Sequence, residues 1–216
     1  MENLNLNKAM VDGQIKPING MSNELVSIFY SLDRSIFMPE LLKAQSYIEK
    51  NISIENNRTI LKPEIVARIA LGIDLKINEN VLIMGATTGY LSAVLSYQAE
   101  TVIVVEEIQE LLHRSENSVK ESDINNVVFI KNDIAKGCSD QSPFNAIVIE
   151  GAVHTVPVNI LNQLEEDGRL LAIISREDIC SAELYRKKGD NFNKEHLFNC
   201  TIPVLDIFME KQSFNF

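Results

Sequence analysis

A turn of small residues after an apolar run is the first place where this sequence could perform chemistry. Gly85-Ala86-Thr87-Thr88-Gly89-Tyr90 follows the run Val81 to Met84 and precedes a helix-like stretch. In open α/β sheets, such a turn at the carboxyl end of a strand binds nucleotide-like ligands. Glu106 ends the next apolar run, 21 positions after Gly85, near the spacing of about 20 at which an acidic side chain bonds ribose hydroxyls. Together the two features predict a site for a ligand that contains a nucleoside.

The glycine pattern discriminates between two kinds of ligand. A dinucleotide turn, G-x-G-x-x-G, requires glycine at positions 85, 87 and 90, but Thr87 and Tyr90 occupy two of these positions. NAD is therefore disfavoured. The G-x-G-x-G turn of S-adenosylmethionine (SAM) enzymes differs from this chain only at Thr87, and its ligand has no pyrophosphate for the backbone to approach.

One further acidic residue has a suitable position. Asp133 follows the apolar run Val127–Ile130 after a two-residue gap, where its side chain could meet an adenine amino group. The alternative is a plain α/β domain in which Gly85 and Gly89 serve only tight turns. In that case Glu106 and Asp133 are solvated loop acids.

The elements that must position these residues follow from periodicity. From about Asn80, short unbroken apolar runs alternate with helical stretches, and unbroken runs are typical of parallel strands buried on both faces. This predicts a Rossmann-like α/β fold, with a mostly parallel twisted sheet and helices on both faces. The runs His196–Thr201 and Val204–Met209, which follow a turn-like stretch at 188–191, predict an antiparallel edge pair.

The first part of the chain has a different pattern. Residues 1–45 have helical spacing, the Asn-rich stretch Asn51 to Lys62 indicates a surface loop or edge strand, and Pro63 begins a further helix. We therefore expect residues 1–78 to form a helical cover and substrate rim over a ligand-binding core of residues 79–216.

Composition excludes several classes of protein. The 216 residues are 45% hydrophobic and 23% charged, as in globular domains, and the net charge of −10 makes nucleic acid an unlikely main partner. Three dispersed cysteines form no metal or disulfide pattern, and no metal site is expected. The sequence has no export signal and no apolar run of membrane-spanning length, so we expect a cytoplasmic protein without membrane contact. The oligomeric state stays open.

At this point the residues carry a resemblance to a known family. Nearly the whole chain, in order, resembles the protein-L-isoaspartate O-methyltransferases, and the closing stretch Pro203 to Phe216 is similar to a divergent bacterial branch of that family. The segments that carry the resemblance are Gln14-Ile15-Lys16, Phe37-Met38-Pro39, Ser46-Tyr47, Arg58 to Pro63, the glycine turn through Tyr90, Val104-Val105-Glu106, Asp133, Pro143 to Ile147, Ala152 to Pro157 and Leu161 to Leu170.

The resemblance implies a SAM-dependent methyltransferase that methylates the carboxylate of isoaspartyl residues in damaged proteins, for protein repair, and leaves S-adenosyl-L-homocysteine. It implies a cofactor site in which the turn holds the methionine part, Glu106 the ribose, and Asp133 with Ile134 the adenine. The turn residues concerned are Gly85, Ala86, Thr87 and Gly89. The substrate pocket would include Thr59, Ile60, Leu61 and His154.

Several positions depart from the family pattern. Leu61 stands where the family has a serine facing the methyl-transfer site, Ile83 stands where it has an acid, and Thr87 replaces a glycine. The family's T-A-A-A segment reads Glu150-Gly151-Ala152-Val153. No residue is therefore assigned a catalytic role. An isoaspartyl carboxylate has a pKa of about 4 and needs no general base, so Leu61 predicts a slow enzyme or a changed substrate.

These departures leave alternatives open. Thr59 could supply a substitute hydroxyl, or it could simply be a strand former. The chain could be a catalytically weakened or inactive SAM-binding relative that serves as a regulatory or interaction module, or it could methylate a small carboxylic acid. If Leu61 lines the site, Leu61→Ser is expected to speed isoaspartyl methylation.

Overall fold

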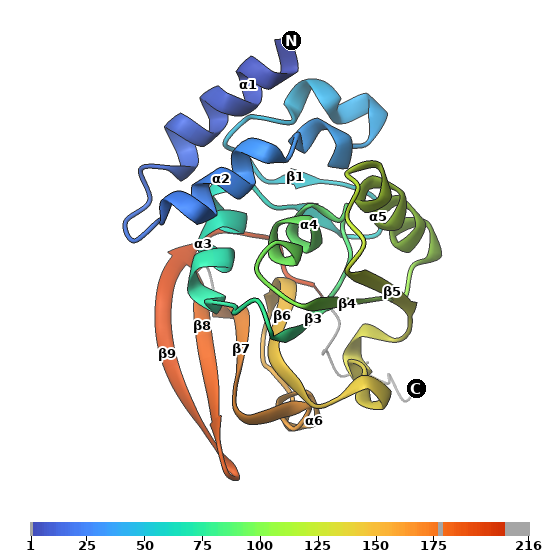
Figure 1. Ribbon diagram of the computed structural model, residues 1–216. Helices are drawn as coiled ribbons and strands as arrows, with labels where there is room; N and C mark the ends of the chain where they lie inside the picture. The colour runs from blue at the N-terminus through green and yellow to red at the C-terminus, as the bar shows by residue number, and fades with distance from the viewer. Residues whose placement is uncertain (1, 177–178, 206–216) are drawn as a thin grey trace, which may run out of the picture.

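The centre of the molecule is a seven-stranded sheet. The computed structural model describes residues 2–176 and 179–205 (Figure 1). The strand order is β5-β4-β3-β6-β7-β8-β9, in which β3 to β7 run parallel and β8 and β9 antiparallel to their neighbours. The predicted Rossmann-like, mostly parallel sheet is confirmed. The strands are β3 (Asn80–Met84), β4 (Thr101–Glu106), β5 (Val127–Lys131), β6 (Phe144–Val153), β7 (Leu164–Arg176), β8 (Ile179–Lys188) and β9 (Asn191–Cys200).

Both faces of the central strands are covered, which explains why their sequences are continuously apolar. Side chains alternate between the faces, so Val81 and Ile83 of β3 pack in one core while Leu82 and Met84 pack in the other. The first core is covered by α2 (Asn23–Ser31), α3 (Pro63–Ile73), α4 (Tyr90–Ser96) and α5 (Gln109–Glu121). The second is covered by the short η4 (Ile134–Lys136) and α6 (Val158–Leu161).

The order of the strands places a ligand site. From β3 the chain builds outward through β4 and β5, then returns to the other side of β3 with β6. Ligands of open α/β sheets bind at the carboxyl ends of the strands where the order reverses in this way. The turn after β3 therefore lies at the reversal point, between the ends of β4 and β6.

The edge of the sheet corrects one sequence-based expectation. The predicted turn at 188–191 does connect an antiparallel pair, but its strands are β8 and β9, whereas His196–Thr201 was expected to pair with Val204–Met209. Val204 instead makes an isolated parallel bridge with Ala152 of β6, and residues 206–209 lie outside the described residues. The sequence of β8 contains good helix formers, and pairing with β7 and β9 overrides that local preference.

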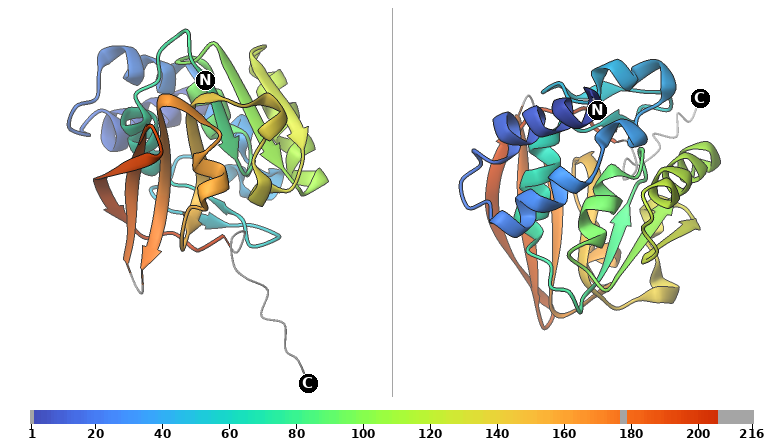
Figure 2. Two further views of the ribbon diagram at one scale, coloured as in Figure 1. Left: turned by 90° about the horizontal axis from the view of Figure 1, so that it is seen from below. Right: turned by 45° about the horizontal axis from the view of Figure 1, so that its top comes forward.

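The N-terminal elements gather at the top of Figure 1, above α3 and α4, and Figure 2 shows the same arrangement from two further sides. Helices dominate here, as expected. The Asn-rich stretch forms the two-stranded hairpin β1–β2, where a loop or edge strand was predicted. The elements are α1 (Glu2–Met10), η1 (Val11–Ile15), η2 (Arg34–Phe37), η3 (Glu40–Gln45), β1 (Ile52–Ser53) and β2 (Thr59–Ile60), and a short turn η5 (Ser139–Gln141) precedes β6.

Candidate functional site

The turn after β3 depends on glycine at two positions. Gly85 and Gly89 have φ angles of 93° and 87°, a region that side chains with a Cβ rarely adopt. Gly89 caps the start of α4, and a Cβ there would lie 2.9 Å from the carbonyl oxygen of Ser115. The turn residues between them, Ala86, Thr87 and Thr88, are buried. The tight turn predicted from the sequence is therefore formed.

Glu106 lies directly beneath this turn. Its Oε2 accepts a hydrogen bond from the backbone nitrogen of Ala86 at 3.0 Å, and its Oε1 accepts from the backbone nitrogens of Glu107 and Ile108 at 2.9 Å each. The carboxylate is completely buried. Backbone donors thus hold the charge in one orientation at the end of β4, beside the turn.

Asp133 and Ile134 lie just after β5, the strand next to β4 in the sheet. The backbone nitrogen of Asn132 donates to the carbonyl oxygen of Glu106 at 3.2 Å, which ties this loop to the end of β4. Asp133 caps η4 by accepting from the nitrogen of Ala135, whereas Ile134 is fully buried in the core. The structure therefore brings the turn, Glu106 and Asp133 together along three neighbouring strand ends.

A side chain from the β1–β2 hairpin contacts the same carboxylate. Arg58, next to Thr59 of β2, donates from Nη2 to Glu106 Oε1 at 3.1 Å and lies 3.6 Å from Glu107 Oε1. Arg58 is 5% exposed. The carboxylate expected to bind ribose is thus already paired with an arginine of the chain itself.

A second buried carboxylate lies on the other side of the turn. Glu150 is on β6, one residue beyond Ile149, which pairs with Met84 of β3. A Cβ built on Gly85 would lie 3.9 Å from the Cβ of Glu150. Glu150 is 5% exposed, and within the described part of the chain its Oε2 has no hydrogen-bond partner. Burial raises the pKa of Glu150 to about 7, and Glu106 adds to this effect while Thr87 and Arg34 oppose it.

The four residues expected at the substrate pocket do not share one surface. Thr59 is half-buried and His154 is exposed, but Ile60 and Leu61 are each only 2% exposed. Leu61 packs in the main core, and its carbonyl oxygen accepts a hydrogen bond from Arg34 Nη2 at 2.6 Å. Serine at position 61 would therefore replace a core side chain.

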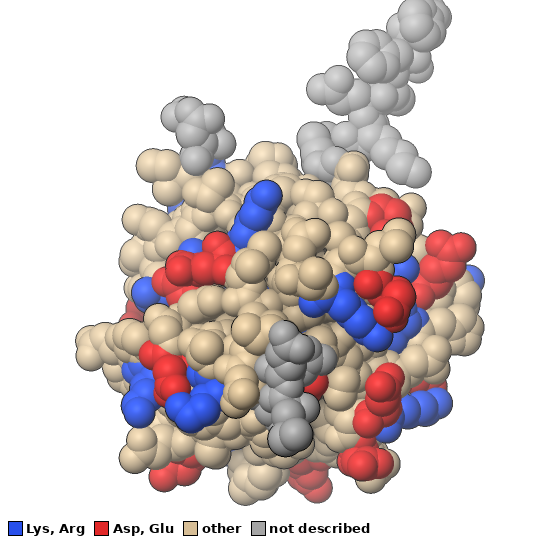
Figure 3. Space-filling model, turned by 90° about the horizontal axis from the view of Figure 1, so that it is seen from above, with Lys and Arg blue, Asp and Glu red and all other residues tan. Residues whose placement is uncertain are grey.

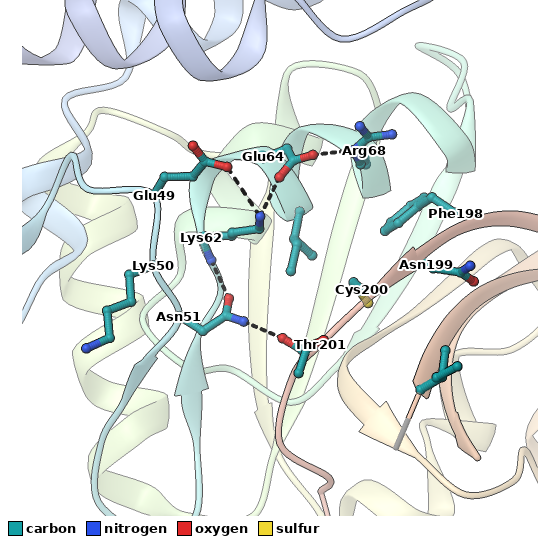
Figure 4. A pocket seen from close by; sticks show the side chains of 12 residues that line it. Glu49, Lys50, Asn51, Lys62, Glu64, Arg68, Phe198, Asn199, Cys200 and Thr201 are labelled. Carbon is teal, nitrogen blue, oxygen red and sulfur yellow. Dashed lines mark hydrogen bonds and ion pairs between the residues drawn. The ribbon is translucent and has the colours of Figure 1, made fainter. Parts of the chain in front are cut away.

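Two hollows lie along the seam between the hairpin segment and residues 198–204. The larger, of about 710 Å³, extends from Glu49 and Lys62 to Phe198 and Cys200 (Figure 4). The smaller, of about 280 Å³, is lined by Ser53, Ile54, Asn57, Arg58, Thr59, Pro203 and Val204. A hydrogen bond of 2.7 Å from Asn51 Nδ2 to the carbonyl oxygen of Thr201 crosses the seam. The smaller hollow therefore reaches Arg58, the partner of Glu106.

Comparison with known proteins decides the family. The model of the family described as protein-L-isoaspartate(D-aspartate) O-methyltransferase matches residues 5–206. The chain belongs to this family. A protein-L-isoaspartate O-methyltransferase of Aliivibrio fischeri (strain MJ11) is 33% identical over 82% of this chain and 85% of its own length. One of Dictyoglomus thermophilum is 30% identical over 82% of this chain and 80% of its own.

The fold agrees with this family. A crystal structure described as a protein-L-isoaspartate O-methyltransferase from Plasmodium falciparum, in complex with S-adenosyl-L-homocysteine, has a TM-score of 0.77 at 20% identity, covering 94% of this chain and 97% of that one. The predictions of family and fold are confirmed. So are those of enzyme class and cofactor, because the family is one of SAM-dependent carboxyl methyltransferases.

Sequence reasoning missed Arg58 and Glu150 as parts of the site. Arg58 was noted only within the family segment, and its contact with Glu106 joins residues 48 positions apart. Glu150 was noted only as a departure. A charged residue at the end of the apolar run Ala146 to Ile149 was the available signal, because charged groups are rarely buried without a reason.

Two further observations bear on partners. On the face seen from above, Lys/Arg and Asp/Glu side chains are interspersed (Figure 3). Among residues 2–176 and 179–205, no helix has the length and apolarity to cross a membrane, and no group of His, Cys, Asp and Glu could hold a metal ion.

Proposed function

We propose that this protein transfers a methyl group from SAM to the side-chain carboxylate of isoaspartyl residues in damaged proteins. The observation that carries the proposal is the buried Glu106 carboxylate held beneath the glycine turn, in a chain that belongs to this methyltransferase family. When bound, SAM supplies an electrophilic methyl on its sulfonium. The chain's own residues bind and orient the two reactants.

Buried polar atoms without partners support a ligand at this turn. Ten buried side-chain atoms of the described residues have no partner, and four of them belong to residues around this turn: Glu150 Oε2, Arg34 Nη1, Arg58 Nε and the hydroxyl of Tyr90. Buried polar groups are nearly always hydrogen-bonded, so a local group of exceptions indicates a site that takes a polar ligand. The residues present therefore fit a ligand with several polar groups.

Each part of the site has a separate task in this proposal. Glu106 accepts hydrogen bonds from the ribose hydroxyls, the turn from Gly85 to Gly89 holds the amino-acid end, and Asp133 with Ile134 borders the adenine. The acceptor carboxylate is ionised at neutral pH, so no residue has to remove a proton. The chain therefore contributes mainly by holding the two reactants in line.

Arg58 determines how the ribose would reach Glu106. Glu106 Oε2 accepts one hydrogen bond, from Ala86, and keeps capacity for a second, whereas Oε1 already accepts three. We infer that Arg58 shifts from Oε1 when the sugar binds. Three backbone donors remain to stabilise the carboxylate during that exchange.

The smaller hollow is the route that we propose for the acceptor peptide. It joins Thr59 and Arg58 to the surface between the hairpin and Pro203, so an isoaspartyl side chain entering there approaches the cofactor side of the sheet. We propose that the Thr59 hydroxyl donates a hydrogen bond to the carboxylate of the methyl-accepting isoaspartyl residue. His154, on the exposed loop after β6, is proposed to border the same opening.

The test is methyl transfer from radiolabelled SAM to an isoaspartyl peptide and to the same peptide with ordinary aspartate. We expect labelling of the isoaspartyl peptide only. Glu106→Gln should lower the rate by at least about tenfold, because it removes a charged acceptor worth about 1.5–3 kcal/mol. Glu183→Gln is the matched control, a buried glutamate on β8 that pairs with Arg176.

The same assay separates the alternatives. SAM binding without labelling of any isoaspartyl peptide would contradict the proposed activity and favour the SAM-binding module. Labelling of small carboxylic acids alone would favour the third possibility. Equal labelling of both peptides would contradict isoaspartyl specificity.

A further inference from the structure

We propose that Glu150 is a cofactor-binding residue, whose carboxylate pairs with the α-ammonium group of the methionine part of SAM. The inference rests on the proposed function and deepens it, because it assigns the charged end of the ligand to a residue that the site description left without a task.

The position of Glu150 fits this task. β3 is flanked by β4 on one side and β6 on the other, and each neighbour carries a buried glutamate beside the glycine turn. Glu106 is the last residue of β4, and Glu150 directly follows Ile149, the last residue of β6 that pairs with β3. Glu106 faces the turn from β4 and is proposed to hold the ribose. The methionine part of the same ligand then extends toward β6, where Glu150 is the buried charged residue just beyond the pairing with β3.

The side chain also points to the correct face of the sheet. Ala146 and Val148 of β6 pack in the same core as Ile83 of β3, and Ile83 pairs with Val148. The register of β6 against β7 shifts between Val148 and Ala152, but both of these residues pack in the core of Ile83. Side chains two residues apart share a face, so Glu150, between them, lies on the face of Ile83. The family resemblance places an acid at position 83 of β3, where this chain has isoleucine. On the same face of the sheet, β6 supplies the carboxylate of Glu150.

Structure alone does not explain this carboxylate. A buried carboxylate oxygen without a hydrogen bond destabilises the fold, and Glu150 Oε2 has no partner in the described part of the chain, although Thr87 lies beside the carboxylate. The nearby cation Arg34 donates from Nε and Nη2 to the carbonyl oxygens of Ser46 and Leu61. Glu150 therefore keeps an acceptor available for a ligand.

The surrounding charge selects a cationic ligand group. The charged groups that face Glu150 are Glu106 on β4 and Arg34 on η2, with Thr87 of the turn beside it. The hydrogen bonds of Arg34 go to backbone oxygens, so it does not neutralise Glu150 by a direct ion pair within the described residues. Glu106 is already paired with Arg58, so Glu150 is the carboxylate of this turn that remains available to an ammonium group.

The experiment compares three ligands by isothermal titration at pH 7.5. SAM and S-adenosyl-L-homocysteine both carry the ammonium, and 5′-methylthioadenosine has the same nucleoside without the amino-acid part. Glu150→Gln should weaken the binding of SAM and of S-adenosyl-L-homocysteine about 10- to 100-fold, because it removes one charge-assisted hydrogen bond. It should change 5′-methylthioadenosine less than twofold. Glu183→Gln should change none of the three.

A second readout measures the protons that the protein releases when the ligand binds. With a pKa of about 7, Glu150 is about half protonated at neutral pH, so pairing with an ammonium releases about half a proton. Titration of S-adenosyl-L-homocysteine in two buffers of different ionisation enthalpy measures this release. Its affinity should also rise about tenfold from pH 6 to pH 8, and Glu150→Gln should remove both effects.

The outcomes are distinguishable. If the unaltered protein binds no S-adenosyl-L-homocysteine, the proposed function and this inference both fail. If the unaltered protein binds S-adenosyl-L-homocysteine but Glu150→Gln changes that affinity less than threefold, only the inference on Glu150 is overturned. The same holds if Glu150→Gln weakens the binding of 5′-methylthioadenosine by the same factor. Weakening of SAM but not of S-adenosyl-L-homocysteine would also overturn it, because the sulfonium would then be the partner.

Discussion

The two sides of β3 hold buried glutamates in opposite conditions. On the β4 side, Glu106 accepts hydrogen bonds from three backbone nitrogens and from Arg58. On the β6 side, Glu150 has an unpartnered Oε2 and a pKa of about 7. Equal burial therefore gives unequal electrostatics. The difference teaches that the chain itself pairs the β4 carboxylate, whereas it leaves an acceptor on the β6 carboxylate, which we propose the ligand fills.

Removal of the Glu106 charge has the largest expected effect. Glu106→Gln leaves Arg58 buried without its main partner, so we expect the free energy of unfolding to fall by about 3–5 kcal/mol. Urea denaturation at pH 7.5 measures the change. Glu183→Gln, whose partner Arg176 is largely exposed, should lose less than about 1 kcal/mol. Equal losses in both variants would contradict the special position of Glu106.

Leu61→Ser tests the packing of residues that lie against Arg34 and Glu150 on the β6 side of the turn. The Leu61 side chain is packed in the core, so its truncation should cost about 2–5 kcal/mol. This loss of packing opposes the rate increase expected from the sequence, because it loosens the backbone segment whose carbonyl oxygen holds Arg34, the cation facing Glu150. Thermal unfolding and isoaspartyl methylation are measured on the same variant. A stable, faster enzyme would show that Leu61 faces substrate instead.

Glu150→Gln should act on stability in the opposite direction to Glu106→Gln. The folded pKa of Glu150, about 7, lies above the ordinary value of 4.5, so the folded state disfavours its ionised form. Wild-type stability is therefore lost relative to the variant as the pH rises from 4.5 to 7. Above pH 7 the variant should be more stable by at most about 3 kcal/mol, and near pH 4 the two should agree. Urea denaturation at both pH values checks this, and a variant less stable at pH 8 would contradict it.

Arg58→Gln has the smallest expected effect and concerns ligand binding. If Arg58 competes with the ribose for Glu106, the variant should bind S-adenosyl-L-homocysteine about three- to tenfold more tightly, a gain of about 1 kcal/mol. Arg114→Gln, which breaks a pair with Glu55 near the same hairpin, should leave the affinity unchanged. Weaker binding by Arg58→Gln would show that Arg58 assists the ligand.

Much of the site could be predicted from sequence because it is built on strand ends. Parallel strands bring their carboxyl ends to one edge, so the spacing of Gly85, Glu106 and Asp133 was sufficient to group them. The Ala86 to Glu106 hydrogen bond bears out the predicted proximity of turn and acid. The turn and the acid follow from local pattern and topology together.

The rest depends on contacts that sequence patterns do not encode. The contact of Arg58 with Glu106 depends on how the β1–β2 hairpin folds over the sheet. The family motif gave Leu61 as a pocket residue, but no sequence pattern indicated that its side chain packs in the core or that its carbonyl oxygen accepts from Arg34. Strand β8 was missed because its strand state is imposed by β7 and β9. Long-range packing decided all three.

The most direct test of this account is the crystal structure of the protein with S-adenosyl-L-homocysteine. The account predicts the ribose hydroxyls on Glu106, with Arg58 displaced from Oε1, and the ligand ammonium within about 3 Å of the Glu150 carboxylate. A ligand that leaves Arg58 on Glu106, or whose ammonium lies away from Glu150, would contradict it.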